Sequence, residues 1–499
     1  MEKWMVAAKK ADFEGWARRF GISPVLARII RNRDITEPEE VEKFLGGTLA
    51  DCYSPWLLKG MEQAVALIQK DLGLGMKIRV IGDYDVDGIC SSYILTRSLR
   101  EMGATVDTAI PHRIRDGYGL NDTLIEEAHS DGIGLIVTCD NGIAAQSQIA
   151  LAKELGMQVV VTDHHEVPFV EDKGRKIQQL PQAEAVIDPK QEGCGYPWPG
   201  ICGAVVAYKL VQALGERMAY GGIAKLLEAL LPFAAMATVC DVMELKDENR
   251  ILVQEGLKRF AACENLGLHA LLEVNGLDPA AVSAYHLGFV LGPCLNATGR
   301  LDTARRALQL LESQDKVSAM TAARELKELN DSRKNMTLQG VEQAVRRLEA
   351  AGGDPDPVIV LYMPEVHESL AGIIAGRVKE KYHHPVFVLT KGEEGVKGSG
   401  RSIEAYHMYE AMSRVKQYFT KFGGHKMAAG LSMREEDVEP LRKALNLDCG
   451  LTREDFAPLV HIDVPMPISY ASMELAKELE RLEPYGTGNP KPLFAKKGV

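Results

Sequence analysis

Four short β-branched segments that each run into acidic residues constrain the fold more than any other feature of the sequence. They are KIRVIGDYD, GLIVTCDNG, QVVVTDHHE and AEAVIDP, and helix-like stretches such as AAQSQIALAKELG lie between them. Strands that alternate with helices of this length are typical of βαβ units in a mainly parallel sheet. In such sheets the ligand site lies beyond the carboxyl ends of the strands, where these acidic residues fall. The sequence therefore predicts an α/β fold with a functional site at that edge.

The length of the chain indicates more than one domain. A chain of 499 residues is too long for one ordinary core, so two or three domains are expected. Short helices precede the strand-rich part, and a highly charged helical stretch connects it to a second α/β segment. A third segment begins near Phe456. The expected boundaries are 1–75, 76–302, 303–352, 353–455 and 456–499.

The sequence carries no sign of export or of a membrane anchor. No apolar run reaches the roughly 18 residues that a transmembrane helix needs. The stretch MEKWMVAAKKADFEGWARRF has charges throughout and no apolar signal core. The nine cysteines include no CxxC pair, which suits a reducing compartment. We therefore expect a cytoplasmic protein that does not bind a membrane.

The net charge bears on the class of ligand. A formal charge of −11 disfavours a polyanionic substrate. Part of that charge lies in carboxylate clusters, however, which divalent cations would neutralise. Nucleic acid is therefore not excluded, provided that a local basic groove supplies the binding.

The first acidic motif is Asp83-Tyr84-Asp85-Val86-Asp87-Gly88, directly after an expected strand. Three carboxylates at alternating positions are similar to the start of an EF-hand loop. That interpretation fails because the twelfth position is Ile94 instead of a bidentate Glu, and because an EF-hand needs a helix in front. Three acids crowded at a strand end repel one another unless a cation holds them, so the motif indicates a metal site.

Three further motifs carry acids or histidines in similar places. Asp140-Asn141-Gly142 is weak by itself, because it is also good turn chemistry. Thr162-Asp163-His164-His165-Glu166 is stronger, because adjacent histidines at the end of a buried strand rarely serve only in packing. Asp241 follows an apolar helical stretch and by itself could be a capping residue.

Together these motifs predict a centre of hard ligands. Several Asp with one or two His suit Mn²⁺ or Mg²⁺ better than structural zinc, and no thiolate set is present. Enough carboxylates are available to bridge two ions about 3.5–4 Å apart, an arrangement that activates water for in-line phosphoryl displacement. Hydrolysis of a phosphate ester or anhydride is the expected reaction class.

The motifs DYDVDG, D-N-G, DHH and TVCDV, in this order, resemble the DHH phosphoesterase superfamily. Further along, GPCLNATGRLDTA, HESLAGIIAGRV, GSGRS, FGGHKMAAG and LEPYGTGNPKPLF resemble the RecJ family of single-strand-specific exonucleases. RIIRNRDITEPEEVEKFL and PHRIRDGYGLN are similar to that family too, so the resemblance spans nearly the whole chain.

The resemblance implies the identity of each domain. Residues 1–75 would form a helical extension and 76–302 the DHH catalytic domain, followed by the helical connector 303–352. Residues 353–455 would form a smaller α/β DHH-associated domain that binds substrate, and 456–499 the start of an OB-fold that looks truncated. The implied activity is removal of mononucleotides from the 5′ end of single-stranded DNA with two Mn²⁺ or Mg²⁺ ions, in DNA repair and recombination. A helicase and a single-stranded-DNA-binding protein are the implied partners.

The resemblance also implies roles for particular residues. The positions that match metal ligands are Asp83, Asp85, Asp87, Asp140, His164 and Asp241. The catalytic set comprises Asp85, Asp87, Asp140, His164, His165 and Asp241. The positions that match substrate-binding residues are Arg113, Asn296, Arg300, Arg377, Ser399, Arg401, Ser402, Gly424 and His425.

Two positions depart from the family pattern. Cys294 stands where a basic residue usually precedes the LNA motif, and Val366 replaces a common aromatic residue. Either change could weaken the grip on DNA, but neither is expected at the metal site. The OB-fold also looks unfinished, because only AKKGV follows LEPYGTGNPKPLF and an OB-fold needs about five strands.

Two alternatives to the exonuclease remain open. A DHH phosphodiesterase for short oligonucleotides or cyclic dinucleotides would be more compact than this chain. An inactive single-strand-binding scaffold on the same fold would be expected to have lost metal ligands, which are all present here. We expect the exonuclease to admit a single strand, and to exclude a duplex, through a groove whose basic groups include Arg300, Arg401 and His425.

Overall fold

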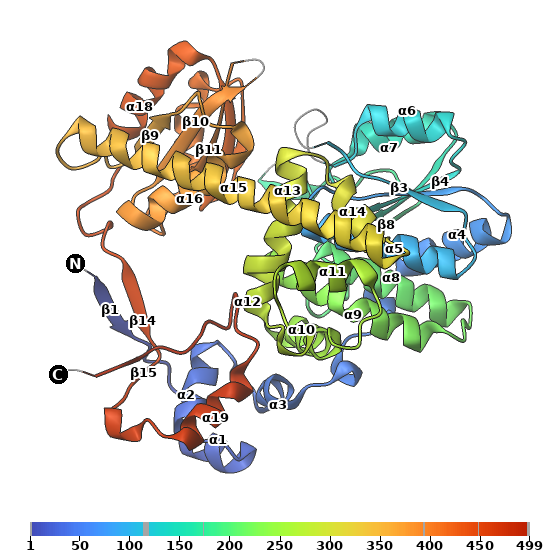
Figure 1. Cartoon of the computed structure of the whole chain (residues 1–499), viewed down its shortest axis with the longest axis horizontal. Helices are drawn as coiled ribbons and strands as arrows, with labels where there is room; N and C mark the ends of the chain where they lie inside the picture. The colour runs from blue at the N-terminus through green and yellow to red at the C-terminus, as the bar shows by residue number, and fades with distance from the viewer. Residues whose placement is uncertain (1, 113–118, 173, 393–394, 448, 497–499) are drawn as a thin grey trace. The chain divides into compact units, whose positions relative to one another are not determined.

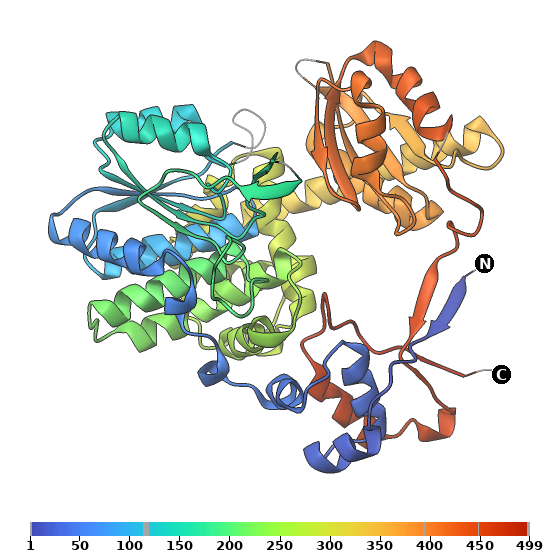
Figure 2. The ribbon, with the colours of Figure 1, turned by 180° about the vertical axis from the view of Figure 1, so that it is seen from behind.

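The computed structural model describes residues 2–112, 119–172, 174–392, 395–447 and 449–496 (Figure 1, Figure 2). The chain divides into two compact units. The larger comprises Ala7–Leu329 and Asp463–Val499, and the smaller comprises Met1–Val6 and Asn330–Ile462.

A five-stranded parallel sheet forms the centre of the larger unit. Its strand order is β3-β2-β4-β5-β8, and every neighbouring pair is parallel. The strands are β2 (Ile78–Ile81), β3 (Val106–Ala109), β4 (Leu135–Cys139), β5 (Gln158–Thr162) and β8 (Ala185–Ile187). Four of them are the four predicted β-branched segments, so the predicted fold class is confirmed. The edge strand β3 was not predicted, because it is only partly buried and carries Asp107 and Thr108.

Alternate residues of these strands enter two different cores, which explains their continuous apolar sequence. In β4, Leu135 and Val137 pack in the core with helices α4 (Met61–Gly73), α5 (Val86–Glu101), α8 (Gly203–Arg217) and α9 (Ile223–Cys240). Ile136 faces the opposite core with α6 (Asp122–Ser130) and α7 (Gln146–Glu154). Helices on both faces of a parallel sheet place the carboxyl ends of the strands at one open edge.

Helix α9 is long and apolar enough to cross a membrane by length and composition, although Lys225 and Glu228 interrupt its apolar run, so the sequence did not indicate it. It contacts α5, α8 and α10 (Asp247–Arg259), and its last three turns are mostly buried in the core. Helix α9 is therefore explained as a core helix.

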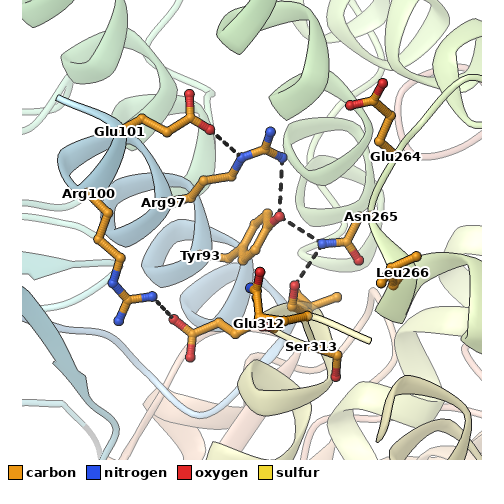
Figure 3. Close-up of a pocket in the computed structure, with 11 residues that line it drawn as sticks. Tyr93, Arg97, Arg100, Glu101, Glu264, Asn265, Leu266, Glu312 and Ser313 are labelled. Atoms are coloured by element: carbon orange, nitrogen blue, oxygen red, sulfur yellow. Dashed lines mark hydrogen bonds and ion pairs between the residues drawn. The ribbon is translucent and has the colours of Figure 1, made fainter. Parts of the chain in front are cut away.

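The C-terminal end of α5 is fixed by a polar network (Figure 3). The Tyr93 hydroxyl accepts hydrogen bonds from Asn265 Nδ2 at 2.7 Å and from Arg97 Nη1 at 3.2 Å. Asn265 Nδ2 also donates to the Leu311 carbonyl at 2.7 Å, and Arg100 pairs with Glu312 at 2.7 Å. The pocket of about 480 Å³ that these groups line begins at Tyr93, roughly 10 Å along α5 from its N-terminus, and extends to the last turn of the helix. Its arginines are paired with carboxylates, so it is a structural feature.

The helical connector differs from the single stretch expected over 303–352. Residues Arg305–Leu311 form a separate helix, α14, which packs against α5 and α11 (Leu266–Val274) in the larger unit. Helix α15 then runs over Lys316–Ala351 as one element of 36 residues. The break falls at Glu312–Asp315, where Asp315 accepts the hydrogen bond from the Ser318 amide and caps the new helix.

The smaller unit has a mixed five-stranded sheet of order β12-β13-β11-β10-β9. The strands are β9 (Ile359–Tyr362), β10 (Val386–Gly392), β11 (Gly395–Arg401), β12 (Lys421–Gly424) and β13 (Ala428–Met433). Only β9 and β10 pair in parallel. The helices of this unit include α16 (Ala371–Tyr382), α17 (Met408–Arg414) and α18 (Val438–Leu447).

Residues 1–75 were expected to form a helical extension, but the segment also contains a strand. Strand β1 (Lys3–Val6) pairs in parallel with β14 (Leu459–Ile462), a contact between residues far apart in the sequence. Helices α1 (Phe13–Phe20), α2 (Pro24–Asn32) and α3 (Pro38–Gly46) follow. They form a small core with Val464 and Leu482 from the C-terminal segment.

Polar contacts fix this C-terminal segment to the rest of the larger unit. Arg33 and Asp463 form a buried ion pair at 2.6 Å. Buried Arg250 donates to the carbonyl oxygens of Phe44, Arg481 and Leu482. Within the described residues 456–496 there are three short strands, β14, β15 (Val464–Pro465) and β16 (Phe494–Ala495), instead of the five of an OB barrel.

Candidate metal centre

The loop between β2 and α5 presents three carboxylates. Asp85 caps α5, and its side chain accepts hydrogen bonds from the amides of Asp87 at 2.9 Å and Gly88 at 3.1 Å. A Cβ on Gly88 would lie 2.4 Å from the Asp83 carbonyl oxygen. The motif therefore needs glycine at this position, because the first turn of α5 lies against the backbone of Asp83.

Asp87 is held by the start of another helix. Its two carboxylate oxygens accept hydrogen bonds from the backbone amides of Gly203 and Ala204, both at 2.7 Å. These amides begin α8, so the carboxylate also lies at the positive end of a helix dipole. A Cβ on Gly203 would lie 2.7 Å from the Asp140 Cβ, so this glycine lets α8 approach the end of β4.

Asp140 follows β4 in a left-handed backbone conformation with φ of 61°. Such a conformation is strained for a residue other than glycine, and it is retained where the surroundings fix it. Asn141 supplies that support, because its Nδ2 donates to the carbonyls of Ile81 and Cys139 at 3.0 and 2.9 Å. The sequence Asp-Asn-Gly therefore makes a turn that presents Asp140.

Asp163 orients the two histidines that follow it. Its carboxylate accepts hydrogen bonds from the amides of Ile143, His164 and His165. It also lies 2.7 Å from His165 Nδ1. These bonds outweigh burial and lower the pKa of Asp163. Burial opposes a charge on His165, but the same hydrogen bond with Asp163 raises the pKa of His165 to about 9.

His164 lies at the centre of the site. Its Nε2 is 3.1 Å from an Asp140 oxygen, 3.5 Å from an Asp87 oxygen and 3.7 Å from an Asp241 oxygen. Asp241 comes from the C-terminal end of α9. Side chains from four elements that are far apart in sequence therefore meet at the carboxyl edge of the sheet.

Among the residues that the structure describes, three overlapping groups have ligand atoms that all lie within 4.8 Å of one another. They are Asp83, Asp85 and Asp140; Asp140, His164 and His165; and Asp87, His164 and Asp241. Asp140 and His164 each belong to two groups. The structure thus brings together all seven residues predicted for metal binding and catalysis.

The electrostatics of the cluster favour a bound cation. Burial, followed by the charge of Asp87, raises the pKa of Asp85 and of Asp140. The same two causes, in the same order, raise the pKa of Asp241 to about 8. Crowded carboxylates in a desolvated site bind divalent ions because only a cation neutralises their mutual repulsion. The oxygen-rich donor set, with imidazole and without thiolate, fits Mn²⁺ or Mg²⁺.

Helix α13 (Gly292–Leu301) places further predicted residues near this centre. A Cβ on Gly299 would lie 2.8 Å from the Tyr84 carbonyl oxygen, so this helix touches the loop of Asp83–Gly88. Arg300 and Asn296 are partly buried on it. Cys294 is fully buried and packs in the core of the larger unit. Arg113 lies outside the described residues.

The remaining predicted substrate-binding residues are in the smaller unit. Ser399 and Arg401 alternate along β11 with Gly398 and Gly400, whose added Cβ atoms would meet core side chains at 2.4 Å. Arg401 Nη1 donates to the Gly400 carbonyl at 2.7 Å. A Cβ on Gly372 of α16 would lie 2.7 Å from Arg401 Nη2. Glycines therefore clear space on both sides of the strand that presents Arg401.

Other residues of this group differ in exposure. Gly424, with φ of 152°, and His425 are exposed at the turn between β12 and β13. Arg377 is exposed on α16 and pairs with Glu380 at 3.1 Å. Ser402 is buried, and its hydroxyl donates to the Tyr406 carbonyl at 2.6 Å, so it fixes the turn after β11. Val366 packs in the core beside Ile374, which accounts for its apolar side chain.

Two residues of the site were not predicted. Asp163 belongs to the motif Asp163-His164-His165 but is not among the predicted site residues, although an acid next to two histidines is a signal for an orienting group. Asp188 directly follows β8 and is buried; its Oδ1 accepts a hydrogen bond from the Lys190 amide at 2.7 Å. Burial raises the pKa of Asp188 to about 7. Its position at the end of the fourth acid-bearing segment could have identified it.

Three family models match successive parts of the chain. Residues 77–238 match the N-terminal domain of the DHH family, residues 356–449 the DHHA1 domain, and residues 462–499 the RecJ OB domain. The order of these matches follows the order of the motifs along the chain.

Named relatives cover nearly the whole chain. It is 36% identical over 495 residues to the single-stranded-DNA-specific exonuclease RecJ of Bacillus subtilis, which covers 98% of this chain and 61% of that protein. It is 36% identical to RecJ of Escherichia coli, with 95% of this chain and 83% of that protein covered. The chain thus spans about three fifths of the length of the Bacillus subtilis relative.

A solved structure has the same fold. The crystal structure of RecJ from Thermus thermophilus in complex with Mn²⁺ is similar with a TM-score of 0.83 and 31% sequence identity. The match covers 99% of this chain and 69% of that one. The structure of the same relative in complex with Mg²⁺ matches with a TM-score of 0.76 at 30% identity.

Proposed function

The chain belongs to the RecJ family within the DHH phosphoesterases, and on that premise we propose that it is a metal-dependent exonuclease of single-stranded DNA. It hydrolyses the strand from its 5′ end and releases mononucleotides, in DNA repair and recombination. The observation that carries this proposal is the convergence of Asp87, Asp140, His164 and Asp241 on one point at the sheet edge.

The ligands divide between two ion positions. Asp83, Asp85 and Asp140 would hold one ion, and Asp87, His164 and Asp241 the other, because each of these sets has ligand atoms within 4.8 Å. Bound Mn²⁺ or Mg²⁺ would activate a water molecule and stabilise charge on the phosphate oxygens. Asp140 lies within reach of both sets, since it is also 3.1 Å from His164.

The chain itself supplies positioning. Asp163 holds the ring of His165, whose side chain is 44% exposed and so is accessible to a phosphate group. A protonated His165 would then donate to a phosphate oxygen. We propose that Arg300 holds a neighbouring phosphate; its helix lies against the Tyr84 backbone in the loop that carries the carboxylates. In the smaller unit, we propose that Ser399, Arg401, Gly424 and His425 bind the backbone of the strand, with Arg377 at the margin.

The experiment that tests this function is a time course on single-stranded DNA labelled at the 5′ or the 3′ end, with Mn²⁺ and with EDTA. We expect mononucleotides to be released first from the 5′-labelled end, and only when metal is present. Release only from very short substrates would indicate a phosphodiesterase for oligonucleotides. Binding without any hydrolysis would indicate a scaffold and contradict the proposal.

We also propose that the protein works in the cytoplasm on strands made accessible by a helicase and covered by a single-stranded-DNA-binding protein. The support for this is the substrate itself, since a 5′-ended single strand inside a cell has to be unwound from a duplex. Stimulation of digestion of a duplex by an added helicase would test it.

A further inference from the structure

A groove beside the metal centre, within the larger unit, is not used by the chemistry described above. It has a volume of about 1050 Å³. One side comes from the end of α9, from α10 and from α12 (Ala284–His286) with the π-helix η4 (Leu287–Leu291); the other comes from Glu483–Lys491. We call it the aromatic groove, and its defining residues are Val242, Lys258, Tyr285, Phe289, Tyr485 and Lys491.

The side chains of Tyr285 and Phe289 form a pair of stacked rings at the groove. Their rings stack at a centroid distance of 5.1 Å and an interplanar angle of 23°. They are nevertheless 63% and 67% exposed, and Val242 beside them is 66% exposed. Large apolar side chains this exposed, and gathered at a groove, indicate a binding surface.

The backbone explains why both rings point outward. They are four residues apart, which places side chains on the same face of a helix. The segment widens into a π-helix at Leu287–Leu291, and short π-helical segments of this kind are frequent at functional sites. The Ser283 amide donates to His286 Nδ1 at 3.1 Å and fixes the start of the segment.

The aromatic groove adjoins the end of α9, which also carries Asp241. Val239, Cys240 and Val242 line it, and they flank the candidate ligand Asp241. Cys240 Sγ donates to the Leu287 carbonyl at 3.4 Å, so the end of α9 is joined to the π-helix. The same helical segment continues to Arg300, which is 15 residues from Tyr285, or roughly 22 Å along a helix.

The charges at the groove favour a polyanion with apolar, planar groups. Lys491 lines it, as does Lys258, which is paired with Glu255 at 2.6 Å, and Glu483 is the one acidic side chain among its lining residues. Unpaired nucleobases stack on aromatic side chains, while the backbone phosphates of the same strand meet lysines. A protein partner would satisfy the apolar surface but would not account for a groove lined by residues on both sides of the candidate ligand Asp241.

We propose that the aromatic groove binds unpaired nucleobases of the substrate, several nucleotides from the phosphate that is hydrolysed, through stacking on Tyr285 and Phe289. This rests on the proposed function, because it assumes that the metal centre acts on single-stranded nucleic acid. The groove would make affinity depend on the length of the substrate. Short substrates would not reach it, whereas long ones would gain affinity there.

The test compares a 5′-phosphorylated dinucleotide with a long 5′-phosphorylated oligothymidylate. In the double variant Tyr285→Ala/Phe289→Ala, KM for the long strand should rise about tenfold, the loss expected for one stacked base. Hydrolysis of the dinucleotide should be unchanged. Tyr285→Trp, which keeps a ring, should retain the wild-type KM. Leu74→Ala is the matched control, because Leu74 is a similarly exposed apolar residue of the same unit.

A second measurement follows stacking directly. The base analogue 2-aminopurine, placed in turn along the long strand, should lose fluorescence on binding at one or two internal positions, and this loss should disappear in the double variant. An unchanged KM for the long strand together with unchanged fluorescence would overturn the stacking site while leaving the exonuclease intact. If the wild-type protein hydrolyses neither substrate with Mn²⁺, the proposed function itself fails.

Discussion

The metal centre of the larger unit and the candidate strand-binding surface of the smaller unit are built in opposite ways. The carboxylates of the metal centre are mostly buried, and backbone amides or a neighbouring side chain fix several of them. In the smaller unit, the guanidinium of Arg401 lies against Gly372, and His425 is exposed at a turn. Chemistry on a phosphate needs ligands held in place, whereas a strand of variable sequence needs accessible groups that tolerate movement.

The largest expected effect comes from removing a shared ligand of the metal centre. Asp140→Ala should lower the hydrolysis rate by about a thousandfold or more, because Asp140 belongs to two of the ligand groups. Binding of single-stranded DNA should persist, since the proposed strand contacts are made by other residues. Exonuclease rates and a DNA titration measure the two effects.

The control for this variant is Asp172→Ala, because Asp172 is an exposed acid on strand β6 (Phe169–Asp172) of the same unit. It should behave as the wild type. Without metal, Asp140→Ala should also be at least as thermally stable as the wild type, because it removes one of several repelling buried carboxylates. Wild-type turnover in Asp140→Ala would reject the assignment of the metal centre.

The second prediction concerns pH and metal together. Asp241 and His165 have pKa values raised to about 8 and about 9, so the folded state retains their protons better than the unfolded state does. The stability that this contributes is present at low pH and is lost as pH rises through these values. Without metal, Tm should therefore fall from about pH 6 to pH 9. Added Mn²⁺ should raise Tm by an amount that grows with pH, because ligands bind metal when deprotonated.

Thermal unfolding with EDTA and with Mn²⁺ across this range measures both trends. Asp163→Asn serves as the matched variant, since it removes the carboxylate that raises the pKa of His165 and should shift part of the metal-free trend to lower pH. A Mn²⁺ effect on Tm that is the same at every pH would contradict the account.

The sequence predicted the interior strands of the larger unit well, and there are physical reasons why it did not predict the more exposed strands. Strands buried on both faces are continuous β-branched runs, so β2, β4, β5 and β8 were predictable, and so were the acids at their ends. The edge strand β3 lacks that signal. The exposed hairpin of β6 and β7 (Arg175–Gln178) and the pairing of β1 with β14 also lack it.

The roles within the site were less predictable than its members. The motif named Asp163 and the histidines equally, and only the hydrogen bonds separate the orienting carboxylate from the groups it holds. Tyr285 and Phe289 belong to no motif, and no local pattern indicated the π-helix in which Phe289 lies. Arg401 and Ser402 are adjacent in sequence, but Ser402 is buried whereas Arg401 is only partly buried.

The third prediction is a moderate loss in the smaller unit. Arg401→Ala should raise KM for single-stranded DNA by about tenfold and lower the slope of affinity against salt by about one phosphate contact. The hydrolysis rate at saturating DNA should change little, because the metal centre is intact. Arg377→Ala is a useful comparison: Arg377 is paired with Glu380, so its effect should be smaller. Unchanged affinity and salt slope in Arg401→Ala would place the binding surface elsewhere.

The smallest effect is expected at Ser402, and it separates a structural residue from a binding one on the same strand end. The Ser402 hydroxyl is buried and donates to the Tyr406 carbonyl at 2.6 Å, so it stabilises the turn that follows Arg401. Ser402→Ala should lower the free energy of unfolding by about 1 kcal/mol, the value of one ordinary hydrogen bond, and leave KM for single-stranded DNA within about twofold of the wild type. Ser399→Ala is the contrasting variant: Ser399 lies on the face of β11 that also presents Arg401 and is one of the proposed strand contacts, so this variant should raise KM. Denaturant unfolding and steady-state kinetics of both variants decide the matter: a tenfold rise in KM for Ser402→Ala with unchanged stability would show that its hydroxyl binds the strand directly.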